Sequence, residues 1–472
     1  MDNLISVLPE KFKEQMQEVL KEKYADYEKS MGEPAVRGIR INTKKIDEKL
    51  FLNLTHLPLE KLGFSDDGFL LLTDEKLGNT PAHLSGLCYL QEPSSMLAVC
   101  ASGIEKFSGN QIKVLDLCAA PGGKTSQIAS RLGESDVIFS NEIVSSRVNA
   151  LYSNIERQGF KNIVITNEKP ENLLAFESYF DFVFVDAPCS GEGMFRKNPE
   201  TINEWSYENV VMCADRQKQI LDVAQRLVKA GGKLIYSTCT FSQEEDEQIV
   251  EHFLKNYNFE IVDVPKEIKA CTIPAKLDGK KGEYARKFLP FSGKGEGQFV
   301  AVFKNKDDEN ERADRLFVKK HTKSIFEIVR SEKQILFDWI NQNMNPSFAR
   351  NLNGQKLLKV GDTVYLSPSE IGDKEISALD SLKFQTIGVK LGKFEKNRFE
   401  PDHAMFMAFG DEFKIVAKLQ ENDVAKFMHG EQLESKLFEK GYAVVKYLDF
   451  PLGGAKLVCG KLKNLLPKGL RI

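Results

Sequence analysis

Cys189 and Cys239 are the residues of this sequence best placed for covalent chemistry. Each follows a short apolar run that predicts a buried strand, FVFV at 182–185 and LIY at 234–236. Neighbouring parallel strands end at the same edge of a sheet, so we expect both thiols in one ligand crevice, with Asp186 beside them. Because a thiolate is a strong nucleophile, the pattern indicates nucleophilic catalysis.

The eight cysteines of the chain do not indicate a metal site or a disulfide framework. They form no C-x-x-C pair and show no regular spacing, so neither a zinc knuckle nor a disulfide-linked domain is expected. Any special cysteine is therefore expected to be a reactive thiol, and no metal is expected. Four cysteines are interpreted as small buried hydrophobic residues: Cys88, Cys100, Cys213 and Cys271.

The stretch VLDLCAAPGGKTSQIA at 114–129 predicts a ligand-binding turn between a strand and a helix. The strand ends at Asp116, and the helix is expected to begin near Thr125. Small residues let the backbone approach a nucleotide, and the start of the helix offers free N–H groups. A phosphate-binding P-loop would need Gly at position 118, where Cys stands, so that alternative is disfavoured. The turn comprises Cys118, Ala119, Ala120, Pro121, Gly122, Gly123 and Lys124.

Glu142 closes the next predicted strand, where a carboxylate can accept hydrogen bonds from ribose hydroxyls. Taken alone, it is as well explained as a solvated loop residue. Together with Asp116 and the small-residue turn, it indicates an adenosine site. The stretch lacks the G-x-G-x-x-G pattern of pyrophosphate-containing cofactors, so S-adenosylmethionine is the leading candidate.

Alternating strand and helix signals predict an α/β fold with a doubly wound, mostly parallel sheet. Helices are expected at 125–132, 145–158 and 214–228, and Ser242 with Glu245 fits a capping box for another helix. The charged segment at 304–315 is interpreted as a linker. We expect an N-terminal α+β unit, a Rossmann-like domain and two small α+β modules, at 1–105, 106–305, 320–395 and 396–472.

Length and composition narrow the class of protein. At roughly 150 residues per domain, 472 residues predict about three domains. Hydrophobic residues make up 42% and charged residues 28%, which excludes collagen-like and wholly disordered chains. The net charge of −3 gives no strong overall field, so nucleic-acid binding must be local. No apolar run approaches the roughly 18 residues of a membrane helix, and the start shows no signal peptide, so a cytoplasmic protein without membrane contact is expected.

Three long motifs resemble those of the Nop/Sun family of RNA cytosine-5 methyltransferases. They are DLCAAPGGKT at 116–125, DAPCSGEGMFRKNP at 186–199 and STCTFSQEEDE at 237–247, in the family's order. GIRINT at 38–43, YLQEPSSM at 89–96 and GEGQFVA at 295–301 extend the resemblance over about 38–305. RFEPDHA at 398–404 and residues 450–472 resemble the bacterial RsmF-type branch, which ends in a PUA-like RNA-binding module. Gly454 and Cys459 stand where that branch usually has Trp and Asn.

The resemblance implies a Rossmann-like domain that uses S-adenosylmethionine and assigns roles to single residues. The cofactor loop falls on 118–124, Glu142 takes the ribose role, and Asp186 lies at both cofactor and base. The family's next acidic cofactor contact aligns with Lys169, and Glu168 beside it is the expected substitute.

Cys239 matches the family's nucleophile. Carbon 5 of cytosine is a poor nucleophile until a thiolate adds to carbon 6. A free thiol is only a few per cent ionised at neutral pH, so Lys124 is expected to assist. Asp186 is expected to bind ring nitrogen 3, and Cys189 to assist removal of the carbon 5 proton. Relatives that methylate DNA attack through the Pro-Cys motif, so Cys189 stays open as the nucleophile.

The implied partner is RNA and not DNA, with small-subunit ribosomal RNA or the small ribosomal subunit favoured. A transfer-RNA substrate and a non-catalytic, RNA-binding assembly factor are the alternatives; the intact Asp186, Cys189 and Cys239 argue against the latter. A target base must leave its stack to reach the crevice. Two basic clusters are expected to hold the RNA backbone: Arg37, Arg40 and Lys44 near the N-terminus, and Lys456, Lys461, Lys463, Lys468 and Arg471 in the tail.

Overall fold

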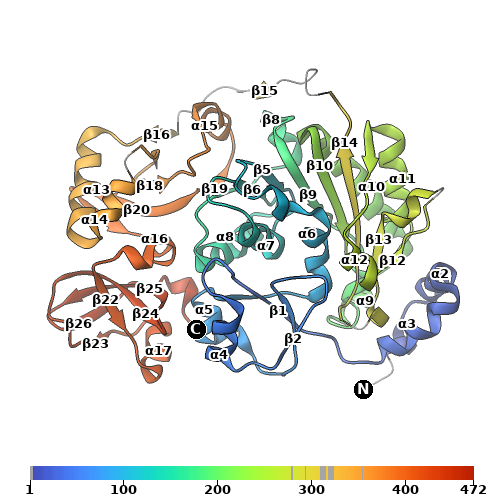
Figure 1. The fold of residues 1–472 in the computed structure, drawn as a ribbon, viewed down its shortest axis with the longest axis horizontal. Helices are drawn as coiled ribbons and strands as arrows, with labels where there is room; N and C mark the ends of the chain where they lie inside the picture. Colours follow the sequence, from blue (N-terminus) through green and yellow to red (C-terminus); the bar gives the residue numbers. More distant parts are fainter. Residues whose placement is uncertain (1–3, 278–279, 293, 309–314, 317–323, 353) are drawn as a thin grey trace.

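The structure is a computed structural model that describes residues 4–277, 280–292, 294–308, 315–316, 324–352 and 354–472. A central sheet lies between N-terminal elements and the C-terminal modules, which are orange and red in Figure 1. No helix among these residues is long and apolar enough to cross a membrane. Residues 309–314 of the expected linker lie outside the described residues.

The central sheet has the predicted doubly wound topology. Five strands run parallel in the order β7-β6-β5-β9-β10, and β14 pairs antiparallel with β10. The chain winds outward from β5 in one direction and resumes on its other side, so the switch point lies between β5 and β9. The strands are β5 (Lys113–Asp116), β6 (Val137–Asn141), β7 (Ile163–Thr166), β9 (Phe180–Asp186), β10 (Val228–Thr238) and β14 (Gln298–Asn305).

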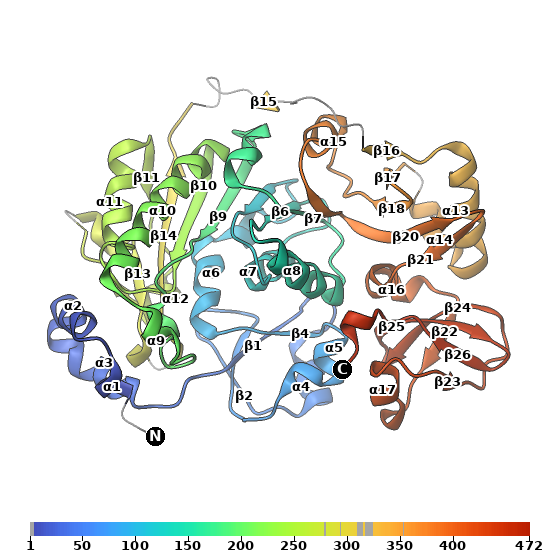
Figure 2. The same ribbon diagram turned by 180° about the vertical axis from the view of Figure 1, so that it is seen from behind.

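Helices cover both faces of this sheet (Figures 1 and 2). Alternate side chains of one strand enter different cores: Leu115 packs with the α10 side and Val114 with the α7 side. Strands buried on both faces are nearly continuous apolar runs for this reason. One face carries α6 (Leu97–Ser102), α7 (Gly123–Arg131), α8 (Ser145–Gln158) and α12 (Lys266–Cys271); the other carries α10 (Tyr207–Leu227) and α11 (Glu247–Asn256).

The predicted capping box is wrong. α11 begins at Glu247 with Asp246 as its N-cap residue, so Ser242 and Glu245 lie before the helix. Ser242 does donate to the Glu245 carboxylate, over 3.2 Å, but Glu245 is buried and turns inward. The side chain therefore serves the loop after β10 and not the helix start.

The N-terminal residues form two separate packing units. Helices α2 (Glu10–Leu20) and α3 (Tyr24–Met31) pack Phe12 and Tyr27 against Phe195, Trp205 and Phe241 of the central domain. The second unit is an antiparallel sheet whose core is distinct from that of the central sheet. Its strands, in order, are β2 (Leu59–Lys61), β3 (Gly68–Leu71), β1 (Gly38–Ile41) and β4 (Cys88–Leu90), with α4 (Glu48–Thr55) and α5 (Pro81–Leu84) alongside.

The first C-terminal module extends the central sheet. Its strand β19 (Phe384–Ile387) pairs antiparallel with β7. The boundary expected near 395 falls in the turn between two paired strands, so this module's sheet continues past it to Pro401. That sheet contains β16 (Ile325–Glu327), β17 (Leu357–Val360), β18 (Thr363–Leu366), β20 (Val389–Glu395) and β21 (Arg398–Pro401), with helices α13 (Arg330–Asn343), α14 (Pro346–Asn351), α15 (Asp373–Leu379) and α16 (His403–Phe409).

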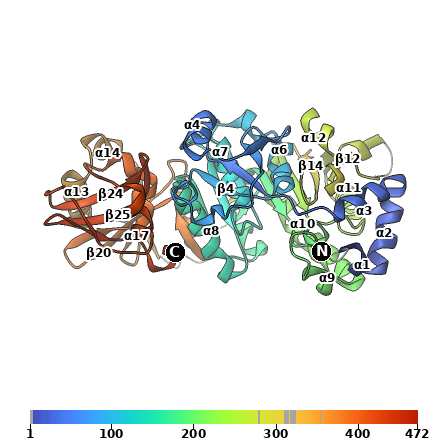
Figure 3. The same cartoon turned by 90° about the horizontal axis from the view of Figure 1, so that it is seen from below.

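The last module is a second five-stranded sheet, drawn in red in Figure 3, and Leu84 of α5 packs against its core. Its Gly454 lies against the ring of Phe406: a Cβ there would come within 2.2 Å of the ring, so Phe406 fills the space of a larger side chain. Cys459 has φ +50° in the turn before β26, a conformation that Asn adopts more readily. The elements are β22 (Ile415–Lys418), α17 (Glu421–Met428), β23 (Leu433–Glu434), β24 (Gly441–Tyr447), β25 (Phe450–Val458) and β26 (Lys461–Asn464).

Candidate active site

Three carboxylates gather at the carboxyl ends of the central strands. Asp116 ends β5, Glu142 follows β6 and Asp186 ends β9, so all three lie at the switch point. Burial raises the pKa of Asp116 to about 7, although the hydrogen bond from the Thr125 hydroxyl (2.6 Å) opposes the shift. The other oxygen of Asp116 is buried and has no hydrogen-bond partner among the described residues. This edge therefore offers an unused acceptor to a ligand.

The small-residue turn is shaped by one glycine and held from behind by α8. Gly122 has φ +104° and caps α7, and a Cβ there would lie 3.0 Å from Leu151. Arg147 donates to the Ala120 carbonyl (2.6 Å), and Asn154 donates to the Pro121 carbonyl (2.9 Å). No side chain in the described part of the chain caps the start of α7, so its first N–H groups can bind a ligand.

Glu142 is in place, whereas Glu168 is not part of the same cluster. Glu142 is buried, accepts from the Val144 N–H (2.9 Å) and lies 3.3 Å from Arg147. A carboxylate has about four acceptor sites, so capacity for ribose hydroxyls remains. The Glu168 carboxylate instead accepts from Asn172 (2.6 Å) and from the Lys383 N–H (2.7 Å) of the C-terminal module.

Two apolar side chains beside Glu142 were not predicted as site residues. Ile143 is 54% exposed and Val144 is 44% exposed, although both are large hydrophobic residues. They follow the carboxylate directly in the chain and so border the proposed adenosine site. Their position after Glu142 was the one signal in the sequence that could have identified them.

Asp186 is held by three donors. Its carboxylate lies 2.7 Å from the Lys124 ammonium and accepts from Ser237 (2.8 Å) and Gln298 (3.2 Å). Burial alone would lower the pKa of Lys124, but the Asp186 charge and hydrogen bond raise it above its usual value. Lys124 therefore stays charged beside Asp186. Ser237 and Gln298 were missed as site residues, although both lie in the motifs that carry the family resemblance.

The structure brings the two expected thiols together. Their Sγ atoms lie 3.3 Å apart, and both side chains are half-buried. The hydrogen bond with Cys239, together with burial, raises the pKa of Cys189 well above its usual value. Cys88, Cys100 and Cys213 are buried as expected, and Cys271 is half-buried.

The loops that carry the thiols are fastened to one another. The Gly193 N–H donates to the Cys239 carbonyl (2.8 Å), and the hydroxyls of Ser190 and Thr240 lie 2.8 Å apart. Both contacts join the loop after β9 to the loop after β10. The separation of the two sulfurs is therefore set by two loops that behave as one unit.

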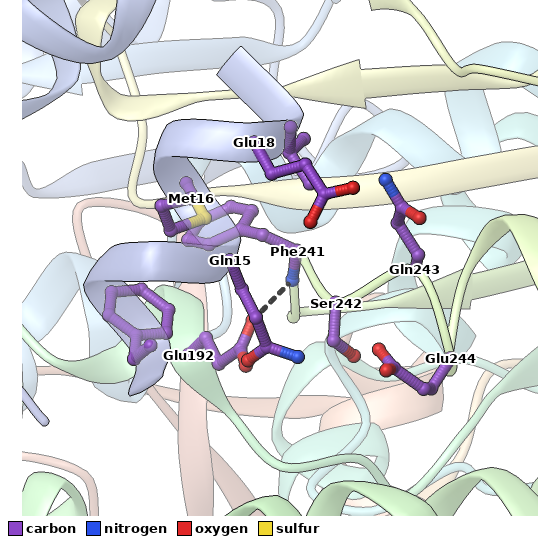
Figure 4. Close-up of a pocket in the computed structure, with 10 residues that line it drawn as sticks. Gln15, Met16, Glu18, Glu192, Phe241, Ser242, Gln243 and Glu244 are labelled. Carbon is purple, nitrogen blue, oxygen red and sulfur yellow. Dashed lines mark hydrogen bonds between the residues drawn. The ribbon is translucent and has the colours of Figure 1, made fainter. Parts of the chain in front are cut away.

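Glu192 adds a buried link between the same two loops, and helix α2 lies behind it. The Glu192 carboxylate accepts from the Phe241 N–H (2.8 Å), drawn as the dashed line in Figure 4, and from the Trp205 indole (2.9 Å). Gln15, Met16 and Glu18 of α2 line a cavity of about 60 Å³ together with Glu192 and residues 241–244. Figure 4 shows these side chains of α2 beside the loop. The N-terminal helices thus support the loop that carries Cys239.

One expected RNA contact is wrong. Arg40 is fully buried and donates to Gln91 (3.1 Å) and Ser126 (2.6 Å), so it binds the N-terminal sheet to α7. Arg37 donates to the backbone carbonyls of Thr73 and Glu75, whereas Lys44 is exposed. An Arg inside a basic strand looks the same in sequence whether it faces solvent or the neighbouring helix.

The cations of the tail divide into two groups. Lys456 pairs with Lys463 across β25 and β26, and Lys461 lies on the same face because side chains alternate along a strand. Lys468 is exposed, but the Arg471 guanidinium donates to the Leu466 carbonyl (3.0 Å).

Among the residues that the structure describes, no group of three or more His, Cys, Asp or Glu side chains is arranged to hold a metal.

Four family models match successive parts of the chain. Residues 107–304 match the 16S rRNA methyltransferase RsmB/F model, and residues 8–93 match the N-terminal domain of 16S rRNA methyltransferase RsmF. Residues 339–409 match the first C-terminal domain of the RsmF rRNA methyltransferase, and residues 414–472 match its PUA domain.

Similar proteins agree with these models. A ribosomal RNA small subunit methyltransferase F of Vibrio vulnificus is 32% identical over 98% of this chain and 97% of its own length. One from Shewanella loihica is 31% identical over 93% of this chain and 90% of its own length. The crystal structure of a methyltransferase homologue from Pyrococcus horikoshii is 27% identical with a TM-score of 0.56, over 64% of this chain and 98% of its own. The chain therefore belongs to the family of ribosomal RNA small subunit methyltransferases F.

Proposed function

We propose that this protein methylates carbon 5 of a cytosine in small-subunit ribosomal RNA in the cytoplasm, with S-adenosylmethionine as methyl donor. The names of the relatives support the RNA class. The observation that carries the reaction type is the pair of thiols 3.3 Å apart, beside Asp186 and Lys124. A cytosine ring needs a nucleophile, a group at nitrogen 3 and a means of release, and these side chains match those needs.

The residues present fit S-adenosylmethionine. Asp116 supplies a buried oxygen without a partner among the described residues, and Glu142 supplies a second carboxylate at the next strand end. The turn 118–124 supplies backbone N–H groups, and Ile143 and Val144 supply apolar surface. When bound, the cofactor supplies an electrophilic methyl group on a sulfonium centre.

We assign the attack on carbon 6 to Cys239. Cys239 holds the position of the family's nucleophile in the motif STCTFSQEEDE, and its sulfur lies 3.3 Å from that of Cys189. Lys124 provides a nearby positive charge, which favours a thiolate. As the bond between Cys239 and carbon 6 forms, the proton lost by the thiol passes to ring nitrogen 3, which neutralises the charge on the ring. Asp186, paired with Lys124, is placed to accept a hydrogen bond from the protonated nitrogen 3.

Cys189 is assigned to release of the methylated base. Release breaks the bond between Cys239 and carbon 6 and removes the proton from carbon 5. Over the 3.3 Å between the sulfurs, Cys189 can pass its proton to the departing sulfur and take the carbon 5 proton in its place. Protons balance, and both thiols are restored for the next cycle.

A denaturing gel with radiolabelled RNA distinguishes the two proposed roles, because the two alanine variants are expected to differ in covalent protein–RNA adduct. Cys239→Ala is expected to form no covalent adduct and no product. Cys189→Ala is expected to complete addition and methylation and to accumulate a protein–RNA adduct. An adduct in Cys239→Ala but not in Cys189→Ala would reverse the two assignments. A second experiment concerns the substrate: bisulfite sequencing of ribosomal and transfer RNA from a deletion strain would identify the RNA class.

We further propose that the N-terminal unit (1–105) and the last module, whose strands run from Ile415 to Asn464, hold the RNA around the catalytic domain (106–305). The first C-terminal module, whose sheet continues to Pro401, lies between the catalytic domain and the last module in the chain. The exposed Lys461 and Lys463 on one face of the last sheet, with Lys456, support this role. Basic side chains there are expected to contact phosphate groups. We assign the Glu168 side chain no contact with the cofactor, because its carboxylate accepts from Asn172 and from the Lys383 N–H.

A further inference from the structure

The peptide groups on both sides of Cys189 are held by two buried side chains. Gln217 of α10 donates to the Pro188 carbonyl over 3.0 Å. The Ser190 N–H donates to the two oxygens of the Glu245 carboxylate over 3.0 and 3.3 Å. Cys189 is therefore fixed from its preceding and its following residue, although neither Gln217 nor Glu245 is among the site residues assigned above.

Gln217 and Glu245 form one hydrogen-bonded unit. Gln217 donates to Glu245 over 2.7 Å, and the Tyr236 hydroxyl lies 3.0 Å from the Gln217 side-chain oxygen and 2.6 Å from the Glu245 carbonyl. All three side chains are 0% exposed. They come from α10, from the loop after β10 and from β10 itself, so three elements meet behind Cys189.

Burying a carboxylate in this position destabilises the folded protein unless its hydrogen bonds compensate for the lost hydration. Removing such a group from water without partners costs several kcal/mol. Glu245 instead accepts from Ser190, Gln217 and Ser242. An apolar side chain could fill the same space without this desolvation cost. The role that we infer for the polar unit is therefore to hold the backbone around Cys189.

We propose that Gln217 and Glu245 are positioning residues that fix Cys189 against Cys239, and that they thereby govern release of the methylated RNA. This inference rests on the proposed function, because it gives Cys189 the release step. The 3.3 Å between the sulfurs is short enough for proton transfer, and a displacement of about 1 Å typically costs about 100-fold in rate.

Glu245→Gln tests the proposal with almost no change in shape. If the new amide nitrogen takes the place of Oε2, it faces the donors of both Gln217 and Ser190. If it takes the place of Oε1, it can donate to the Ser242 hydroxyl but still faces the Ser190 N–H, which lies 3.3 Å away. One contact turns unfavourable in either orientation, so Cys189 shifts. We expect turnover to fall about 10- to 100-fold, while the covalent adduct accumulates on a denaturing gel as in Cys189→Ala. Glu244→Gln is the matched control, since Glu244 is the preceding residue and accepts over 3.0 Å from Tyr207 in the partly buried outer part of the loop.

A general loss of structure would reduce adduct and product together, so adduct accumulation separates positioning from stability. Gln217→Met gives an independent variant without a carboxylate change and is expected to show the same accumulation. If Cys189→Ala accumulates no adduct, the proposed function has misassigned the release step. If Cys189→Ala accumulates adduct but neither Glu245→Gln nor Gln217→Met does, the positioning role is overturned and the proposed function stands.

Discussion

Lys287 is the buried charge whose removal should most clearly disturb the loop of Cys239. Its ammonium lies 3.1 Å from Asp246 and 2.9 Å from Glu247, and it donates to the Phe241 carbonyl over 2.7 Å. The side chains of Lys287, Asp246 and Glu247 are 2%, 0% and 5% exposed. Lys287→Met keeps the length of the side chain but leaves two buried carboxylates without their cation.

Breaking a buried pair by removing one partner costs about 3–5 kcal/mol. With an m-value of about 2–3 kcal/mol per M urea, the unfolding midpoint should drop by roughly 1–2 M. Lys269→Ala is the control, because its pair with Asp263 is 35% and 46% exposed and such surface pairs contribute about 0–1 kcal/mol. Fluorescence or circular dichroism in urea measures both midpoints.

The destabilisation should also grow with pH. Burial raises the pKa of Asp246 even with Lys287 present, and removal of the lysine raises it further. When the pKa of a carboxyl group is higher in the folded state than in the unfolded state, the group costs no stability below its unfolded pKa. The free energy of unfolding then falls as the pH rises through the folded pKa. A midpoint shift no larger than that of Lys269→Ala, or a shift independent of pH, would refute the reasoning.

Three further outcomes are expected. Gly122→Ala should lower stability by about 1–3 kcal/mol and weaken S-adenosylmethionine binding in calorimetry, because φ is +104° there, whereas Gly123→Ala should be milder. Replacing Lys456, Lys461 and Lys463 by Ala should flatten the salt dependence of RNA binding by about 0.7–0.9 logarithmic units for each phosphate group that is no longer neutralised, with no change for the exposed Lys266→Ala. Burial and then Asp402 raise the pKa of Glu156, so the melting temperature should fall less from pH 5 to pH 9 in Glu156→Gln than in the wild type.

The sheet was predictable because its strands are apolar runs that end at chemically distinctive residues. The ends of helices were harder to predict. α10 begins at Tyr207, seven residues before the expected Ala214, where the Ser206 side chain accepts from the Asn209 N–H over 3.1 Å. The β-branched Val210 and Val211 in its first turns weaken the helical signal in the sequence. The strand β19 was not predicted as part of the central sheet. Its pairing with β7 joins segments more than 200 residues apart, and no local pattern in either segment specifies that partner.

The site was predictable where a residue's role follows from its place at a strand end. Cys189, Cys239, Asp186 and Lys124 were expected together, and the structure places them together. The surroundings of Arg40 and Glu168 were not predictable, because the sequence gives their charge but not the side to which they point. Burial against α7 and a contact with the C-terminal module decide those two cases, and both depend on tertiary packing.

The residues around Cys189 show why such contacts escape a motif. Glu245 lies within the stretch STCTFSQEEDE, where four acidic residues, at 244–247, follow one another and look alike. The structure separates them: Glu244 faces Tyr207, Glu245 faces the Ser190 N–H, and Asp246 accepts from Thr238 (2.7 Å). Gln217, the partner of Glu245, lies on a long helix whose sequence does not distinguish it from the other polar residues there. Only the fold brings that amide to the Pro188 carbonyl. The motif in the sequence therefore identifies Cys189 as a candidate reactive thiol, whereas the side chains that hold it in position are found only in the tertiary structure.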